Sequence, residues 1–112
     1  MRSLWTKEMR LRRPEDFRRV WSEGRSWAHP LFVLWSRPNT LNCTRIGITA
    51  SRKVGNAVER NRARRLLREA ARHLYSEMAA GWDIVLVARS RILEASEGQV
   101  ELGLRMTLDR TH

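Results

Sequence analysis

The segment from residue 57 to 79 constrains the fold most, because its apolar and charged residues fall on different sides of a helix. On a helix that turns about 100° per residue, one side collects apolar residues: Ala63, Leu66, Leu67, Ala70 and Leu74. That spacing predicts a helix packed on a core. The other side collects Arg60, Asn61, Arg64, Arg65, Arg68 and Arg72. The fold must bury one side and leave the arginines in solvent.

This row of arginines predicts a polyanionic partner. Arg60, Arg64 and Arg68 recur at intervals of four with no carboxylate beside them. Like charges at that spacing repel each other by about 0.2–0.5 kcal/mol per pair, whereas a merely solvated face usually mixes acids with bases. Arginine grips phosphate groups bidentately. We therefore expect the helix to bind nucleic acid.

The overall charge agrees with that expectation and locates it. The chain has 22 Lys and Arg against 12 Asp and Glu, a net charge of +10, with an isoelectric point near 11.5. Up to Arg68 there are 17 basic and 5 acidic residues, and after it 5 basic and 7 acidic ones. Such an excess is typical of nucleic-acid-binding domains. Binding is expected in the first two thirds of the chain.

Length and cysteine content indicate one domain in a reducing compartment. A chain of 112 residues is long enough for one modest core. Cys43 is the only cysteine, which excludes an internal disulfide and a multi-thiolate zinc site. No secretory signal or membrane-spanning stretch is recognisable. We expect a cytoplasmic protein with no membrane partner.

Helix and strand signals alternate along the chain. Residues 1–13 are polar and basic and are predicted to be a flexible arm, so the domain is expected over 14–112. Pro14 and Gly24 are expected to begin and end a short helix. Residues 25–35 are extended, but Pro30 interrupts them, so the strand is placed at 31–35. The loop 37–44 is predicted to join it to strand 45–51 as a hairpin.

The second half of the chain predicts two helices around one strand. Asn56 and Glu59 form a capping box at the start of the helix that runs to about residue 79. Residues 83–88 are continuously apolar after Asp83, as in a buried strand. Ser96 and Gln99 are expected to open a last helix through Leu108. The result is an α/β chain, an α+β sandwich with order α-β-β-α-β-α and helices packed on a small mixed sheet.

One βαβ unit sets the expected handedness of the fold. Strand 45–51, helix 57–79 and strand 83–88 make this unit, and nearly all such crossovers are right-handed. From the residues alone we would expect that hand here.

The helix and the turn before it resemble a known family. Lys53-Val54-Gly55-Asn56-Ala57-Val58, Arg60-Asn61-Arg62 and Arg64-Arg65-Leu66-Leu67-Arg68 are similar to the signature of the bacterial ribonuclease P protein family. The flanking elements follow in the family's order from about Leu11 to Leu108. The resemblance implies a ribonucleoprotein that removes 5′ leaders from precursor tRNA, with catalysis in a large RNA and its Mg²⁺ ions. It also implies a left-handed βαβ crossover, against the general rule.

The resemblance implies two binding surfaces and no catalytic residue in the protein. The catalytic RNA is expected on Arg52, Lys53, Asn56, Arg60, Asn61, Arg62, Arg64, Arg65 and Arg68. The single-stranded leader is expected in a cleft formed by Phe17, Trp21 and Trp35, with Arg12, Arg13, Arg18 and Arg19 beside it. Aromatic rings stack on any base for about 1–3 kcal/mol each. The alternative for each ring is ordinary core packing. The expected partners are therefore the catalytic RNA and precursor tRNA, with no protein partner implied, and whether the protein itself binds metal stays open.

Three other functions compete with this hypothesis. An independent enzyme lacks support, because His29, His73 and His112 have no metal-ligand spacing and no nucleophile elbow or phosphate-binding glycine loop is present. Asp16 with Glu15 or Glu23 could hold a metal but fits better as partner of a helix dipole. A structural ribosomal RNA-binding protein is the main alternative. A helix-turn-helix is disfavoured because the basic helix follows a strand.

Overall fold

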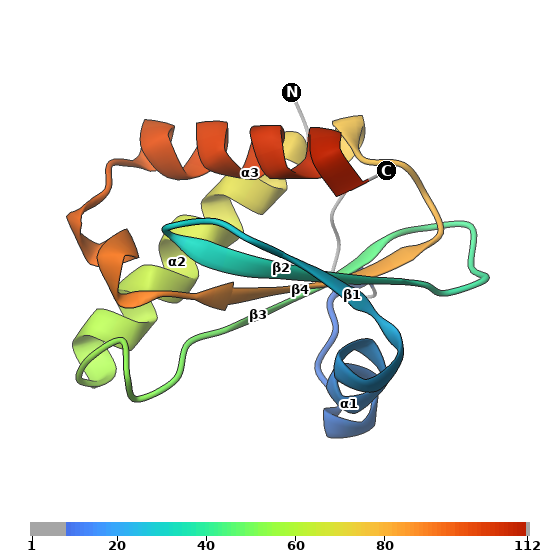
Figure 1. Cartoon of the computed structure of the whole chain (residues 1–112), viewed down its shortest axis with the longest axis horizontal. Coiled ribbons are helices and arrows are strands. Elements are labelled where there is room, and N and C mark those ends of the chain that lie inside the picture. The colour runs from blue at the N-terminus through green and yellow to red at the C-terminus, as the bar shows by residue number, and fades with distance from the viewer. Residues whose placement is uncertain (1–8, 112) are drawn as a thin grey trace.

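A mixed sheet of four strands separates one helix from the other two (Figure 1). The computed structural model describes residues 9–111. Its elements in chain order are α1 (Pro14–Glu23), β1 (Arg25–Ala28), β2 (Phe32–Pro38), β3 (Arg45–Thr49), α2 (Ala57–Leu74), the 3-10 turn η2 (Tyr75–Glu77), β4 (Trp82–Ala88), the 3-10 turn η3 (Ser90–Glu94) and α3 (Glu97–Thr111). The predicted fold class is confirmed, with one strand more than expected.

The order of strands in the sheet is β1-β2-β4-β3. β4 pairs antiparallel with β2 and parallel with β3. The predicted hairpin between strands 31–35 and 45–51 is therefore wrong, because β4 lies between them. The reason is burial: Ile84, Val85 and Leu86 are all at most 1 % exposed, and a strand that is apolar on both faces is stable only inside the sheet.

The additional strand is β1, which forms a hairpin with β2. Trp27 pairs with Leu34 in the antiparallel register. The turn between the strands is closed by backbone hydrogen bonds in both directions between His29 and Phe32. Pro30 sits in this turn rather than inside a strand, so the proline marks a reversal of the chain and not a break in one extended segment.

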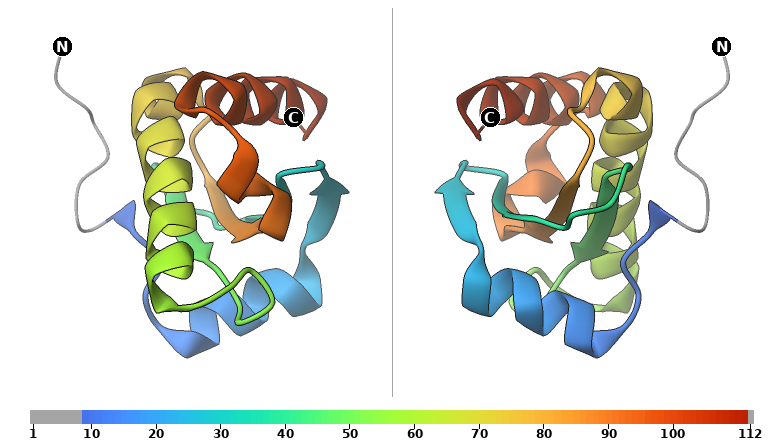
Figure 2. Two further views of the ribbon diagram at one scale, coloured as in Figure 1. Left: turned by 90° about the vertical axis from the view of Figure 1, so that its left-hand side faces the viewer. Right: turned by 90° about the vertical axis from the view of Figure 1, so that its right-hand side faces the viewer.

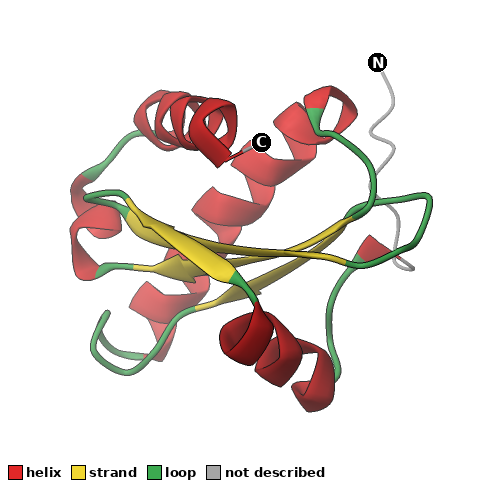
Figure 3. Ribbon diagram, turned by 45° about the vertical axis from the view of Figure 1, so that its right-hand side comes forward, coloured by secondary structure: helices red, strands yellow, loops and turns green. Residues whose placement is uncertain are grey.

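The two faces of the sheet carry different cores. Alternate residues of β2 and β4, such as Phe32, Leu34 and Leu86, are buried on the side of α2 and α3. The opposite set packs on the side of α1, where Val85 meets Val20 of the helix. Figure 3 shows α2 and α3 on one side of the strands and α1 on the other. The side of α1 has the smaller core and retains partly exposed rings.

The crossover from β3 through α2 to β4 is left-handed. The two strands are parallel neighbours, and α2 covers the face that also carries α3. Viewed from that face with both strands running upward, β4 lies to the left of β3 (Figures 1 and 2). The hand implied by the family resemblance is confirmed, and the general right-handed expectation is wrong for this chain.

The predicted first residues of the helices are confirmed, while α2 and α3 end at other residues than predicted. Asn56 Oδ1 accepts from the backbone N–H of Glu59, whose carboxylate accepts from the N–H of Asn56, each at 2.9 Å. α2 ends at Leu74 rather than near 79, because η2 tightens the chain there. α3 opens with the expected pair of Ser96 and Gln99 and runs to Thr111.

Gly24 ends α1 for a different reason from the one expected. Its backbone is extended, not left-handed. A Cβ at this position would lie 2.4 Å from the carbonyl oxygen of Val20 and 2.8 Å from that of Ser36. Glycine is required because the chain passes close to two carbonyl groups as it enters the sheet.

The packed part of the chain begins before Pro14. Residues 9–13 form a strap along the edge of β3, where the N–H of Leu11 donates to the carbonyl of Ile46 at 3.0 Å and Leu11 is buried. The predicted arm of residues 1–13 is thus wrong for its last part, because an apolar side chain in it completes the core under α1. Residues 1–8 lie outside the described residues.

Candidate nucleic-acid interface

The exposed side of α2 carries the predicted arginines, here called the basic face. Arg60 and Arg64 are half-buried, while Asn61, Arg62, Arg65 and Arg68 are exposed. Among residues 9–111, none of these arginines forms an ion pair. Arg52 and Lys53 are exposed in the turn just before the helix. The face therefore presents unneutralised positive charge on a rigid element.

Hydrogen bonds hold parts of this face in place. Arg60 donates through Nη1 to the carbonyl of Gly55 at 2.9 Å, and Arg64 donates to the side chain of Asn61. The side-chain oxygen of Asn56 accepts a hydrogen bond in the capping box, so this oxygen is already engaged within the helix. Arg72, which the helical spacing adds to the row, instead pairs with Glu69. The unpaired row therefore ends at Arg68.

An exposed valine lies within the basic face. Val58 is 77 % exposed and lines a shallow hollow together with Asn61, Arg62, Arg64, Arg65 and Arg68. An apolar side chain ringed by guanidinium groups suits a sugar or base edge between phosphates. The sequence analysis missed this residue. Val58 could have been predicted to lie in this face, because helical spacing places it on the same side of the helix as the arginines.

Aromatic side chains form a second surface, here called the aromatic groove, on the α1 side of the sheet. Phe17 and Trp21 of α1 have ring centroids 5.8 Å apart with a tilt of 51°. Trp35 of β2 packs, like Phe17, on the small core of Leu11, Val20 and Val85. Trp21 is 44 % exposed, while Phe17 and Trp35 are half-buried. Phe17 and Trp35 are anchored in the small core, Trp21 contacts Phe17, and each ring keeps part of its surface in solvent.

A glycine under the groove determines how close α1 lies to the sheet. A Cβ at Gly47 of β3 would lie 2.7 Å from Cζ of Phe17 and 3.0 Å from Cβ of Leu11. Phe17 therefore rests directly on the backbone of β3. The position of one groove ring depends on the absence of a side chain in the strand.

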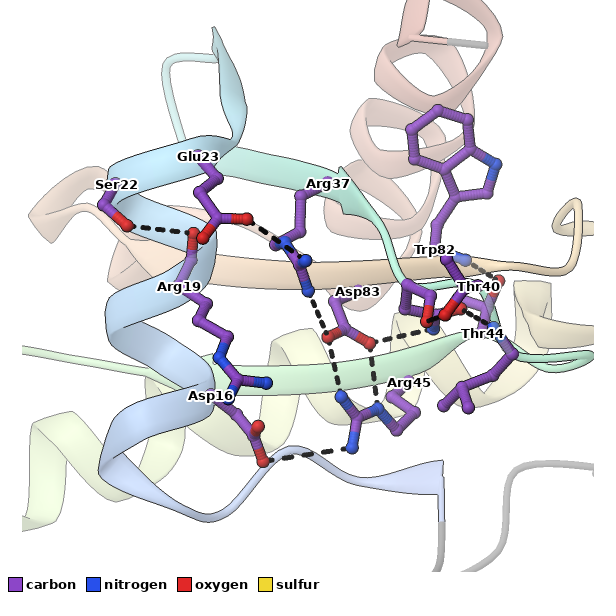
Figure 4. Close-up of polar contacts among 12 residues, drawn as sticks. Asp16, Arg19, Ser22, Glu23, Arg37, Thr40, Thr44, Arg45, Trp82 and Asp83 are labelled. Atoms are coloured by element: carbon purple, nitrogen blue, oxygen red, sulfur yellow. Dashed lines mark hydrogen bonds and ion pairs between the residues drawn. The ribbon is translucent and has the colours of Figure 1, made fainter.

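A buried carboxylate ties α1 to three strands (Figure 4). Asp83 of β4 is 1 % exposed and accepts two hydrogen bonds from Arg45 of β3, at 2.9 and 2.8 Å. Arg37 of β2 lies 3.6 Å from the same carboxylate. Arg45 reaches Asp16 of α1 at 3.9 Å, and Arg37 reaches Glu23 at 3.2 Å. The hydrogen bonds that Arg45 donates to Asp83 raise the pKa of Arg45.

Known proteins match these features. The Ribonuclease P family profile covers residues 5–112. The chain is 40 % identical to the "Ribonuclease P protein component" of Herpetosiphon aurantiacus over 93 % of its length and 85 % of the relative's. The identity is 38 % to that of Caldanaerobacter subterraneus subsp. tengcongensis, over 99 % and 93 %. The chain belongs to the ribonuclease P protein family. It is a subunit of a tRNA-processing endoribonuclease.

A solved structure of this family agrees in three dimensions. The ribonuclease P protein of Thermotoga maritima superposes with a TM-score of 0.83 at 33 % identity, covering 92 % of this chain and 97 % of that one. The ribosomal alternative is not supported, since the relatives found carry the ribonuclease P name.

The arginines predicted to line the path of the leader lie on two different flanks of α1. Arg18 is exposed on α1 and, by helical spacing, lies on the same flank as Phe17 and Trp21. Arg12 and Arg13 lie on the other flank of α1, in a hollow with Arg19, Arg37 and Arg45. The ribonuclease P subunit thus presents the aromatic rings and Arg18 on one flank of α1 and the other arginines on the opposite flank.

The described acidic and histidine side chains do not assemble a metal site. Over residues 9–111 no three His, Cys, Asp or Glu side chains come together as metal ligands. Asp16 and Glu23, which could in principle have held a metal, are the partners of Arg45 and Arg37. Within the same residues, no helix is both long and apolar enough to span a membrane.

Proposed function

We propose that this subunit binds the catalytic RNA of ribonuclease P through the basic face and the 5′ leader of precursor tRNA through the aromatic groove. The observation that carries the proposal is the separation of the two surfaces. One is a helix side of arginines without acidic partners, and the other is a set of half-exposed rings on the far face of the sheet. The first suits a folded polyanion, the second an unpaired strand.

The basic face suits RNA recognised by shape. Arginines spaced by four residues reach successive phosphates along one side of a duplex, and such contacts read the backbone rather than the base sequence. Arg52 and Lys53 extend the surface beyond the end of α2. Contact with about six phosphates gives a slope of roughly −4 to −5 in a log–log plot of affinity against salt.

The aromatic groove suits a leader of varying sequence. Phe17, Trp21 and Trp35 offer π-faces, which stack on every base. Because Phe17 and Trp35 pack on Val20 and Val85, these two rings lose little side-chain freedom on binding. Arg18 beside them can pair with the leader backbone.

The chemistry of cleavage is assigned to the RNA. Mg²⁺ held mainly by the RNA subunit would activate the attacking water there. In the protein, Asp16 and Asp83 are already paired with arginines. The protein's role is to bind and orient. We place the complex in the cytoplasm, where precursor tRNA is made.

The test compares binding of two substrates to the reconstituted ribonucleoprotein. With wild-type protein, precursor tRNA with a leader should bind more tightly than mature tRNA. Trp35→Ala should remove about 1–3 kcal/mol of that difference, the value of one stacked base, and leave affinity for the catalytic RNA unchanged. Trp27→Ala, on the edge strand β1, is the matched control. If Trp35→Ala weakens the catalytic RNA instead, or if cleavage occurs without added RNA, the proposal is wrong.

A further inference from the structure

We infer a second RNA-binding site, the arginine hollow, on the flank of α1 opposite the aromatic groove, and we assign it to phosphates of the catalytic RNA. The hollow measures about 700 Å³ and is bordered by the strap, α1 and the loop after β2. Its lining includes Arg10, Arg12, Arg13, Arg19, Arg37 and Arg45, with Asp16 as the acidic member. The assignment rests on the proposed role of the basic face.

Two of the arginines in the hollow already have acidic partners. Arg45 is bound to Asp83 and lies near Asp16, and Arg37 lies between Asp83 and Glu23 (Figure 4). These pairs build the floor of the hollow and fix its shape. Because Arg37 and Arg45 are paired in this way, little of their positive charge is available to a ligand.

The charge available to a ligand comes from the rim. Arg13 and Arg19 are exposed, and neither forms an ion pair within residues 9–111. They lie at the start and in the middle of α1. Arg10 and Arg12 add positive charge from the strap. A hollow with fixed walls, and with the guanidinium groups of Arg13 and Arg19 at its rim not neutralised within residues 9–111, is suited to phosphate groups.

The wall opposite α1 is a rigid loop. Asn39 is 8 % exposed, and its side chain donates to Asp83 at 2.9 Å and to the carbonyl of Cys43 at 3.1 Å. Its Oδ1 accepts from the N–H of Leu41 at 2.8 Å. Thr40 between them has a φ of 62°, which a β-branched residue rarely adopts. Such strain is retained where the surrounding structure enforces it and is frequent at ligand-binding positions.

Continuity with the basic face favours the catalytic RNA as the ligand. Arg68 of α2 lines a small hollow with Arg10 and Arg12, and these two strap arginines also line the arginine hollow. Positive charge therefore runs from α2 over the strap to the outer flank of α1. An RNA docked on α2 can continue along this path, whereas a leader in the aromatic groove lies across α1 from it.

The test uses the double variant Arg13→Gln/Arg19→Gln. Both residues are exposed, so the fold should be unaffected, as circular dichroism will verify. We expect affinity for the catalytic RNA alone to fall about tenfold near physiological salt, and the salt slope to lose roughly 1.4–1.8, the contribution of two phosphates. Arg13→Lys/Arg19→Lys should retain most of the affinity. Arg91→Gln/Arg110→Gln, with equal charge loss away from α1, should behave as wild type.

Two outcomes would overturn the inference. If the double variant binds the catalytic RNA like the Arg91/Arg110 control, the hollow is not an RNA site. If it binds that RNA normally but weakens only precursor tRNA with long leaders, the site belongs to the substrate. A failure of the proposed function would give a different result from a failure of this inference. In that case wild-type protein and Arg60→Gln would bind the catalytic RNA equally weakly.

Discussion

Asp83 and Arg45 form a two-point hydrogen-bonded ion pair between neighbouring parallel strands, with Nε to Oδ1 at 2.9 Å and Nη2 to Oδ2 at 2.8 Å. The aspartate is buried and the arginine is about a quarter exposed. Through Arg45 and Arg37 the same carboxylate reaches both ends of α1, at Asp16 and Glu23. The helix that carries two groove rings is thereby fixed to the sheet.

Asp83→Ala should destabilise the protein by about 3 kcal/mol. Removing one member of a buried pair leaves its partners without compensation, which costs about 3–5 kcal/mol, and the partial exposure of Arg37 and Arg45 places this case near the lower end. Urea unfolding followed by circular dichroism measures the change. Glu23→Ala, at an exposed member of the same network, should cost less than about 1 kcal/mol. Equal losses for both variants would contradict the account of Asp83 as the centre of the network.

Gly47→Ala should shift Phe17 and weaken leader binding. The added Cβ would lie 2.7 Å from the ring, and overpacking of this kind costs about 1–3 kcal/mol. We expect a lower free energy of unfolding and a reduced preference for leader-bearing tRNA, with binding to the catalytic RNA unchanged. At Gly98 a Cβ meets open space, its nearest neighbour being Ser96 Oγ at 4.0 Å. Gly98→Ala should therefore lower neither the free energy of unfolding nor the preference for leader-bearing tRNA. If Gly98→Ala also reduced the leader preference, the effect of Gly47→Ala would not be local.

Stability should decline in mild acid because of His29. Its ring stacks on Phe32 at 4.6 Å, and its Nδ1 accepts from the N–H of Leu31 at 3.1 Å. Burial lowers the pKa of His29 below its usual value. The unfolded chain therefore binds a proton first as the pH falls, so this contribution is intact above about pH 6.5 and is lost below it, by at most about 1.4 kcal/mol per pH unit.

Urea unfolding of wild type and His29→Gln between pH 7.5 and pH 5 provides the measurement. The variant should be less stable at pH 7.5 because the ring stack is lost. It should also lose less stability on acidification than wild type. Identical pH dependence of the two proteins would mean that His29 does not carry the effect.

Local signals in the sequence predicted most of the elements but not their arrangement. The capping boxes at Asn56 and Ser96 and the period of residues 57–74 act within a few residues, so they can be read from the chain. Sheet order is set by competition among strands for the central position. β4 lies between β2 and β3 because it is apolar on both faces, and nothing in the loop after β2 indicates this. The left-handed crossover came from the family resemblance alone.

The candidate site was predictable where it lies on a helix. The arginines of α2 follow from helical spacing, and the structure changes only the end of the row, where Glu69 pairs with Arg72. That Arg12 and Arg13 lie on the opposite flank of α1 from Arg18 could not be predicted. Their positions depend on the strap along β3 and on which flank of α1 faces the loop at Asn39. The importance of Gly47 likewise appears only once Phe17 lies on it.

The most direct test of the account is the affinity of Arg60→Gln/Arg64→Gln/Arg68→Gln for the catalytic RNA at physiological ionic strength. The three residues carry the basic face, and their loss should weaken assembly at least about a hundredfold and flatten the salt slope by roughly 2–3. Arg91→Gln/Arg105→Gln/Arg110→Gln removes the same charge from η3 and α3, outside the basic face, and should assemble normally. Intact assembly of the first variant, or equal weakening by both, would contradict the claim that this helix binds the RNA.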